Sequence, residues 1–202
     1  MNFDDVQKSL KYSNQVTDKL RFTDNFFTQE LLEKLYNYCT TVDSKKWQDL
    51  SDGYAQANRK VITWDIDTVV EEVTELMTNQ CDILDIFFPF VLDGEAVSHN
   101  FLGASIWKDT DGYEIPVHTD NPEVSCTIQI YIGGNCNANH GTTFFVDDKE
   151  LVLPFIPNCG YILNQTEPRI KHKTTKTLPK NSERYSIHFV YGYLPKKVEP
   201  TY

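Results

Sequence analysis

The sequence predicts an α+β protein in which helices come first and a β-rich region follows. Apolar residues recur at helical spacing in the first hundred residues, whereas after about residue 97 short β-rich runs alternate with Gly, Pro, Asn and Asp. Helices followed by strands are typical of helices packed on a β core. No linker divides the chain. We therefore expect one domain over residues 1–202, with a mainly helical support region at 1–96 and a β core at 97–195.

Two helices are predicted in the first region. The stretch 24–40 places Thr28 as an N-cap before an apolar stripe, and the stretch 66–83 repeats the apolar spacing. The stripes are Leu31, Leu32, Leu35, Tyr36 and Cys39 in the first helix, and Val69, Val70, Val73, Leu76 and Met77 in the second. The run FFPFV at 87–91 fits either the end of a helix or a buried strand, because so short a run has no readable period.

Six short runs predict strands in the second region. They are NFLGASIW, GYEIPVH, SCTIQIYIGG, TTFFVD, CGYILN and RYSIHFVYG. Strands of this length separated by turn residues are typical of an antiparallel sandwich or barrel. The pair Asp147–Asp148 between two of these runs is expected to form a hairpin turn and not a second metal site.

Composition narrows the function classes. A formal net charge of −10 argues against a nucleic-acid-binding surface, which needs clustered Lys and Arg. The five cysteines show no CxxC spacing, which favours a reducing cytoplasm over a disulfide framework. The first residues lack an apolar signal region, and no run approaches the ~18 apolar residues of a membrane span. We expect a soluble cytoplasmic protein that binds neither nucleic acid nor membrane.

The segment PVHTDNP, residues 116–122, contains a candidate metal-binding pair. Asp, Asn and Pro in succession also suit a plain surface turn. If 113–118 is a strand, His118 and Asp120 project from the same face at its end and can ligate one ion. One more histidine would complete a facial triad suited to non-haem Fe(II). The candidates for that third ligand are His99, His140, His172 and His188.

The last predicted strand contains a second polar group. Arg184 and Ser186 in RYSIHFVYG share one face of the strand, and His188 follows on that face. A buried arginine needs a planar anion, and a carboxylate fits its two-pronged guanidinium. That carboxylate is either one of the protein's own acidic side chains or part of a ligand.

The ordered set of HTD at 118–120, His172 and RYS at 184–186 resembles the Fe(II)/2-oxoglutarate-dependent dioxygenases, in particular the prolyl 4-hydroxylase-like branch. The likeness covers roughly residues 100–192. HTDNP followed by CTIQIYIGG is similar to the family's metal pair and its following strand, and CGYILN is similar to the strand before the distal histidine.

The resemblance implies a double-stranded β-helix, a jelly-roll or cupin-like barrel, with N-terminal helices packed on it. It implies that His118, Asp120 and His172 bind Fe(II). Arg184 and Ser186, with Tyr131 as a further hydroxyl donor, would hold the distal carboxylate of the co-substrate 2-oxoglutarate. O2 would be the second co-substrate and ascorbate a reductant. The reaction would hydroxylate an unactivated C–H bond of a peptidyl proline or similar substrate, releasing succinate and CO2.

The sequence departs from the family at several positions. Where the family has Tyr-x-x-Gly before the metal pair, this chain offers Trp107 or Tyr113, and His140 stands where a glycine is frequent. Position 190 is Val, where the nucleic-acid-demethylating branch has a second arginine. His99 is expected to be structural, and His188 to face into the barrel without binding iron.

The alternative function is a non-catalytic jelly-roll module that binds a ligand and whose histidines are incidental. For an enzyme, the substrate can be a peptide, a protein side chain or a small molecule, and the sequence leaves both the substrate and the oligomeric state open. The basic stretch 171–184 fits either a loop over the site or a solvated loop.

Overall fold

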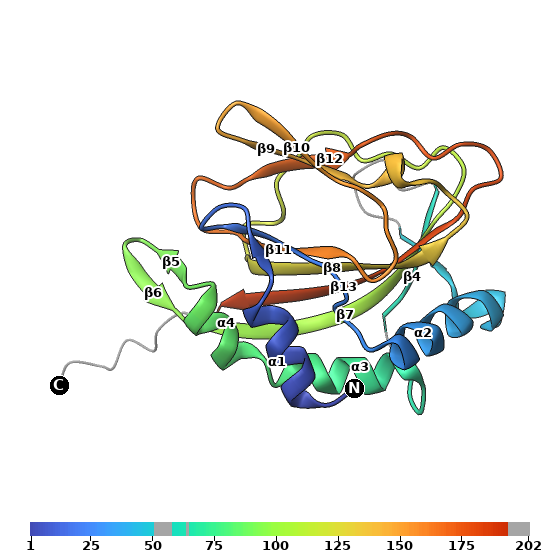
Figure 1. Ribbon diagram of the computed structural model, residues 1–202, viewed down its shortest axis with the longest axis horizontal. Helices are drawn as coiled ribbons and strands as arrows, with labels where there is room; N and C mark the ends of the chain where they lie inside the picture. The colour runs from blue at the N-terminus through green and yellow to red at the C-terminus, as the bar shows by residue number, and fades with distance from the viewer. Residues whose placement is uncertain (51–57, 64, 194–202) are drawn as a thin grey trace.

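The computed structural model describes residues 1–50, 58–63 and 65–193, so the last two residues of the predicted 97–195 core lie outside the described part. The elements form three layers, with helices on one face of a large sheet and a small sheet over the other face (Figure 1). The helices are α1 Phe3–Lys11, α2 Gln29–Thr41, α3 Val69–Thr78 and α4 Cys81–Phe87, with short 3₁₀ turns η1 Ser44–Lys46 and η2 Ala138–His140.

The large sheet has eight antiparallel strands in the order β1-β2-β11-β8-β13-β7-β4-β3. Their bounds are β1 Asn14–Gln15, β2 Leu20–Thr23, β3 Gln48–Asp49, β4 Arg59–Ile62, β7 His99–Asp109, β8 Val124–Gly134, β11 Gly160–Asn164 and β13 Arg184–Tyr193. The small sheet has the order β10-β9-β12, formed by β9 Thr142–Val146, β10 Lys149–Leu153 and β12 Lys171–Thr174. A separate hairpin joins β5 Phe90–Leu92 to β6 Glu95–Val97. The coarse expectation of helices packed on an antiparallel β core is confirmed.

Side-chain alternation divides the three central strands into a helix-facing and a small-sheet-facing set. On β8, Ile128 and Ile130 belong to the apolar core that includes the helices, whereas Tyr131 belongs to a second apolar core with Phe144 of the small sheet. The same alternation on β13 sends Tyr185, Ile187, Phe189 and Tyr191 into the helix-side core. Arg184, Ser186 and His188 therefore project into the space between the two sheets.

The helices match the predictions in part. Thr28 caps α2 as expected, accepting a hydrogen bond from the Leu31 backbone N–H. The single helix expected over 66–83 is wrong, because α3 ends at Thr78 and α4 begins at Cys81. The break falls at Asn79–Gln80, where Asn79 has poor helix propensity. The run 87–91 contains both a helix end, at Phe87, and the start of β5, at Phe90.

The region 1–96 is less purely helical than predicted. Its strands β2 and β4 join the large sheet, β2 beside β11 and β4 beside β7. The boundary at residue 97 is therefore no structural boundary, because the sheet takes strands from both sides of it.

Five of the six predicted strands form, and the sixth, GYEIPVH, does not. Residues 113–118 run extended beside β12, but only His118 makes a regular bridge, to His172. Pro116 has no N–H to donate, which prevents a continuous ladder. Asp147 and Asp148 form the predicted β9–β10 turn, both at positive φ. None of the described helices has the length and apolar character that a membrane span needs.

Candidate metal and co-substrate site

His118 and His172 face each other where the segment before β8 meets β12. The His118 N–H donates to the His172 carbonyl at 3.0 Å, and the His172 N–H donates back at 2.8 Å. Residues opposite each other in an antiparallel bridge have their side chains on the same face. The two imidazole rings accordingly lie 4.3 Å apart, centroid to centroid.

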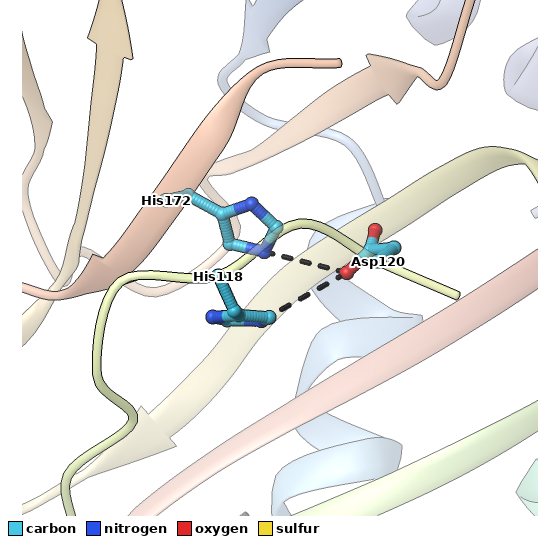
Figure 2. Close-up of side chains that lie close together, drawn as sticks. All are labelled: His118, Asp120 and His172. Carbon is cyan, nitrogen blue, oxygen red and sulfur yellow. Dashed lines mark ion pairs between the residues drawn. The ribbon is translucent and has the colours of Figure 1, made fainter. Parts of the chain in front are cut away.

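Asp120 projects toward both histidines, two residues beyond His118 (Figure 2). Its Oδ1 lies 3.4 Å from Nε2 of His172 and 3.9 Å from Nε2 of His118. Its Oδ2 accepts hydrogen bonds from Thr127 Oγ1 at 2.8 Å and from Gln165 Nε2 at 2.6 Å. One carboxylate oxygen is thus fixed by neighbours and the other is presented to the imidazoles.

Both histidines direct Nε2 toward Asp120 and Nδ1 toward backbone. Nδ1 of His118 lies 2.9 Å from the Pro116 carbonyl, and Nδ1 of His172 lies 3.5 Å from that of Ile170. A carbonyl can only accept, so the 2.9 Å contact places the proton of a neutral His118 ring on Nδ1 and leaves the lone pair on Nε2. That is the tautomer an Nε2 metal ligand requires.

The surroundings of Asp120 and His118 favour the protonation states that bind a metal ion. Burial raises the pKa of Asp120, but the His172 imidazole and the Thr127 hydroxyl outweigh it, so the net pKa lies well below its ordinary value. Burial and the neighbouring His172 lower the pKa of His118. A deprotonated carboxylate and neutral imidazoles are the forms that bind a divalent cation.

The loop HTDNP is held from outside by Arg169. Its Nη1 donates to the carbonyls of Asp120 and Asn121 at 3.1 and 2.7 Å, and its Nη2 donates to that of Pro122 at 2.8 Å. This contact could not be predicted from the sequence, because Arg169 lies 49 positions beyond Asp120 in a segment without periodicity.

The three side chains fit a metal ion. One ligand atom from each of His118, Asp120 and His172 lies within 4.8 Å of the others. Two imidazoles and one carboxylate on one side of an ion form the facial donor set typical of non-haem Fe(II), with positions left for exogenous ligands.

The predicted co-substrate residues lie in the same region but differ in their contacts. Arg184 lines a cavity of about 60 Å³ together with the three candidate ligands. Ser186 does not line this cavity; it lies behind Gln129, which does, and its Oγ accepts a hydrogen bond from Gln129 Nε2 at 3.1 Å. Tyr131 is also fully buried, with its hydroxyl 2.7 Å from Thr142 Oγ1. The cavity is lined by Arg59, Trp107, Tyr113, Ile115, His118, Asp120, Gln129, Thr142, Tyr161, His172, Lys173, Thr174, Arg184 and His188.

Arg184 forms an ion pair that the sequence left as one of two alternatives. Its Nε and Nη2 donate to Oδ2 of Asp109 at 3.0 and 2.7 Å. Asp109 also accepts from Arg59, at Oδ1 from Nε at 2.6 Å and at Oδ2 from Nη2 at 3.0 Å. Burial alone would raise the pKa of Asp109, but the guanidiniums of Arg59 and Arg184 lower it by more. The net pKa therefore lies below its ordinary value, and the carboxyl stays ionised.

Arg59 and Asp109 are the site residues that sequence reasoning missed. Their only local signal is that Asp109 is an acid two residues beyond a predicted strand, and Arg59 lies 50 positions away. The pairing follows from the sheet, since Asp109 of β7 lies between Arg59 of β4 and Arg184 of β13 in register.

The other histidines do not join the candidate ligands. His99 is buried, and its two ring nitrogens are hydrogen-bonded to Ser125 Oγ and to the Phe88 carbonyl, which is a structural role. His140 lies in η2, and its backbone carbonyl accepts from Arg184 Nη1 at 2.5 Å. His188 faces the cavity as expected, with its ring 4.1 Å from the indole ring of Trp107.

Comparison with solved structures shows a common fold. The chain is similar to a prolyl-4-hydroxylase from Pseudomonas putida, with 13% identity, a TM-score of 0.68, and coverage of 96% of this chain and 100% of that one. A prolyl hydroxylase from Trichoplax adhaerens, in complex with a peptide from the oxygen degradation domain of hypoxia inducible factor, has 15% identity, a TM-score of 0.65, and coverage of 94% and 88%. A 2OG-Fe(II) oxygenase family oxidoreductase from Burkholderia pseudomallei has 10% identity, a TM-score of 0.60, and coverage of 95% and 90%.

No family model and no curated protein matches the sequence. At identities of 10–15% the structural likeness establishes the fold. The chain has the fold of the prolyl 4-hydroxylases and other 2OG-Fe(II) oxygenases, as the residue motifs predicted.

Proposed function

We propose that the protein is an Fe(II)- and 2-oxoglutarate-dependent dioxygenase that hydroxylates a C–H bond and releases succinate and CO2. The convergence of His118, Asp120 and His172 carries the proposal. The fold of its structural neighbours supports it, and we take the two facing sheets as the walls of a double-stranded β-helix.

In this proposal the chain's own residues hold and orient the reactants. Nε2 of each histidine and Oδ1 of Asp120 bind the iron, while Thr127 and Gln165 keep the carboxylate aimed at it. Bound Fe(II) would activate O2, which is the oxidant, while 2-oxoglutarate would be the co-substrate that is decarboxylated and ascorbate a reductant that maintains Fe(II).

Arg184 provides the positive charge for the distal carboxylate of 2-oxoglutarate. A guanidinium matches a carboxylate in charge and geometry. Ser186 and Tyr131 belong to the same proposed site and support it through Gln129 and Thr142, both of which line the cavity. Aromatic side chains such as Trp107 and Tyr161 restrict water around the bound co-substrate.

The proposed substrate is a peptidyl proline or a similar unactivated C–H position. The prolyl hydroxylase titles among the structural neighbours, and the peptide complex of one of them, support this choice. A small molecule would use the same metal ligands, and substrate-stimulated succinate release distinguishes a peptide from a small-molecule substrate.

Two measurements test the proposal. Anaerobic addition of Fe(II) and 2-oxoglutarate should produce a visible absorption band of the iron chelate, which a non-catalytic ligand-binding module would not give. Succinate release should then rise when prolyl peptides, amino acids or cell extract are screened in air. Absence of both the band and any succinate release would exclude the dioxygenase.

A further inference from the structure

Arg59, Asp109 and Arg184 form a buried cluster with one excess positive charge. Each of the three is at most 2% exposed. The single carboxylate of Asp109 is shared by both guanidiniums, leaving a formal charge of +1 on the three side chains. Buried charges are normally balanced by a partner, so this cluster lacks one anion.

A tyrosine beside the cluster has an unused hydroxyl. Tyr113 is 1% exposed, and its hydroxyl has no hydrogen-bond partner within the described part of the chain. Its ring lies under Arg59 at 4.4 Å and Arg184 at 5.4 Å, measured from the guanidinium carbon to the ring centroid. Buried hydroxyls are nearly always hydrogen-bonded, so this one indicates a missing acceptor or donor.

The position of Asp109 shows how an anion would enter. Arg184 has Nε and Nη2 on Asp109 Oδ2 and Nη1 on the His140 carbonyl. Nη1 also lies 3.5 Å from the Gly141 carbonyl. A ligand carboxylate that binds the two-pronged Nε–Nη2 edge of this guanidinium therefore replaces Asp109 there. Asp109 would remain bound after that exchange, because Arg59 holds both of its oxygens.

We propose that Arg59 and Tyr113 belong with Arg184 to the receptor for the distal carboxylate of the co-substrate, and that Asp109 takes the place of that carboxylate in the ligand-free protein. This inference rests on the proposed function for the identity of the ligand. On binding, the ligand carboxylate replaces Asp109 on Arg184 and accepts the Tyr113 hydroxyl. The two guanidiniums of Arg59 and Arg184 are then balanced by two carboxylates, that of Asp109 and that of the ligand, and the cluster is neutral.

The arrangement selects a class of ligand. It favours 2-oxo acids that carry a second carboxylate over 2-oxo monocarboxylates of similar length, because only the former supply the missing charge. Arg59 contributes to ligand binding without contacting the ligand, because it keeps Asp109 bound when Arg184 exchanges Asp109 for the ligand carboxylate.

Tyr113→Phe is the cleanest test, because it removes only the unpartnered hydroxyl. The matched control is Tyr191→Phe, a buried tyrosine in the helix-side core whose hydroxyl donates to the Met77 carbonyl at 2.9 Å. Both are measured by thermal unfolding without ligand and by titration calorimetry of 2-oxoglutarate into the Mn(II)-loaded protein.

Tyr113→Phe should keep the wild-type unfolding midpoint and lose about two- to tenfold in 2-oxoglutarate affinity, the effect of one neutral hydrogen bond. Tyr191→Phe should show the reverse, with a lower midpoint and unchanged affinity. A Tyr113→Phe protein with wild-type affinity would overturn the assignment of Tyr113.

Asp109→Asn and Arg59→Met test the exchange of carboxylates. Asp109→Asn removes the internal competitor, so saturating 2-oxoglutarate should raise its unfolding midpoint more than that of wild type. Arg59→Met leaves a neutral Asp109–Arg184 pair and should weaken 2-oxoglutarate at least about tenfold, by the loss of a charged partner. A folded Asp109→Asn protein with weaker 2-oxoglutarate binding, or an Arg59→Met protein with wild-type affinity, would overturn the proposal.

The outcome is separable from that of the proposed function. Wild-type protein that binds Mn(II) but no 2-oxoglutarate would contradict the dioxygenase assignment itself. Wild-type protein that binds 2-oxoglutarate, with unchanged affinity in the Tyr113 and Arg59 variants, would contradict only this inference.

Discussion

His118 and His172 are directly opposite each other in an antiparallel bridge, each backbone N–H donating to the carbonyl of the other. Two imidazoles that are 54 positions apart in sequence are thereby fixed on one face by the backbone. The bridge explains how a chain with an interrupted strand at Pro116 still positions the pair.

Asp120 depends on its neighbours for its orientation, and Thr127→Val tests this dependence. The variant removes the 2.8 Å hydrogen bond to Oδ2 and keeps the side-chain shape. We expect metal affinity to fall about 10- to 100-fold, the usual effect of losing an outer partner of a metal ligand. Thr74→Val is the control, because Thr74 is buried in α3 and its hydroxyl donates to the Val70 carbonyl of the same helix at 2.8 Å. Equal metal affinities in the two variants would contradict the orienting role.

Arg184→Ala should weaken 2-oxoglutarate far more than it weakens the metal. A charge-assisted contact with a buried carboxylate contributes roughly 1.5–3 kcal/mol, so the dissociation constant should rise about ten- to a hundredfold. Ser186→Ala should act in the same direction with a smaller effect, because Ser186 accepts from Gln129 behind the cavity wall. Calorimetry on metal-loaded protein gives both affinities. An unchanged 2-oxoglutarate affinity in Arg184→Ala would remove β13 from the co-substrate site.

His188→Gln should leave metal affinity within a few-fold of wild type. His188 faces the cavity, but its ring packs against Trp107, and it is not part of the converging group of candidate ligands. Stoichiometric metal analysis after desalting provides the readout. Loss of metal in His188→Gln, together with retention in His172→Ala, would reverse the ligand assignment.

The stability of the metal-free protein should fall with acid because of His188. Burial lowers the pKa of His188 to about 4, against an ordinary value of 6.5. Between these values the unfolded chain binds a proton that the folded chain does not, so the free energy of unfolding decreases as the pH falls. The slope is at most about 1.4 kcal/mol per pH unit, and smaller where cavity water reaches the ring. Denaturant unfolding of wild type and His188→Gln between pH 6.5 and 4 should show a steeper loss in wild type. Parallel curves would show that His188 does not titrate in this way.

The local part of the fold could be predicted from the sequence. Thr28 and the apolar stripe that follows it define α2, and period-two alternation correctly placed Arg184, Ser186 and His188 on one face of β13. The motif order also identified His118, Asp120 and His172, the three residues that the structure brings together.

Contacts between distant segments could not be predicted. Arg59 and Asp109 meet because β4 and β7 are neighbours in the sheet, and nothing in the residues around Arg59 marks that pairing.

Two local features of the helices were also missed. The break at Asn79–Gln80 was missed because the apolar spacing continues through α3 and α4. α1 was also missed, although Asn2 and Asp5 form a capping box at its start.

The central claim is that His118, Asp120 and His172 bind one metal ion. It is tested most directly by a crystal structure with Mn(II), a redox-stable substitute for Fe(II), located by its anomalous scattering. We expect a single ion about 2.0–2.2 Å from Nε2 of both histidines and a carboxylate oxygen of Asp120, the range for nitrogen and oxygen ligands on a divalent ion. An ion bound elsewhere, or an ion with His140 or His188 in place of His172, would contradict the claim.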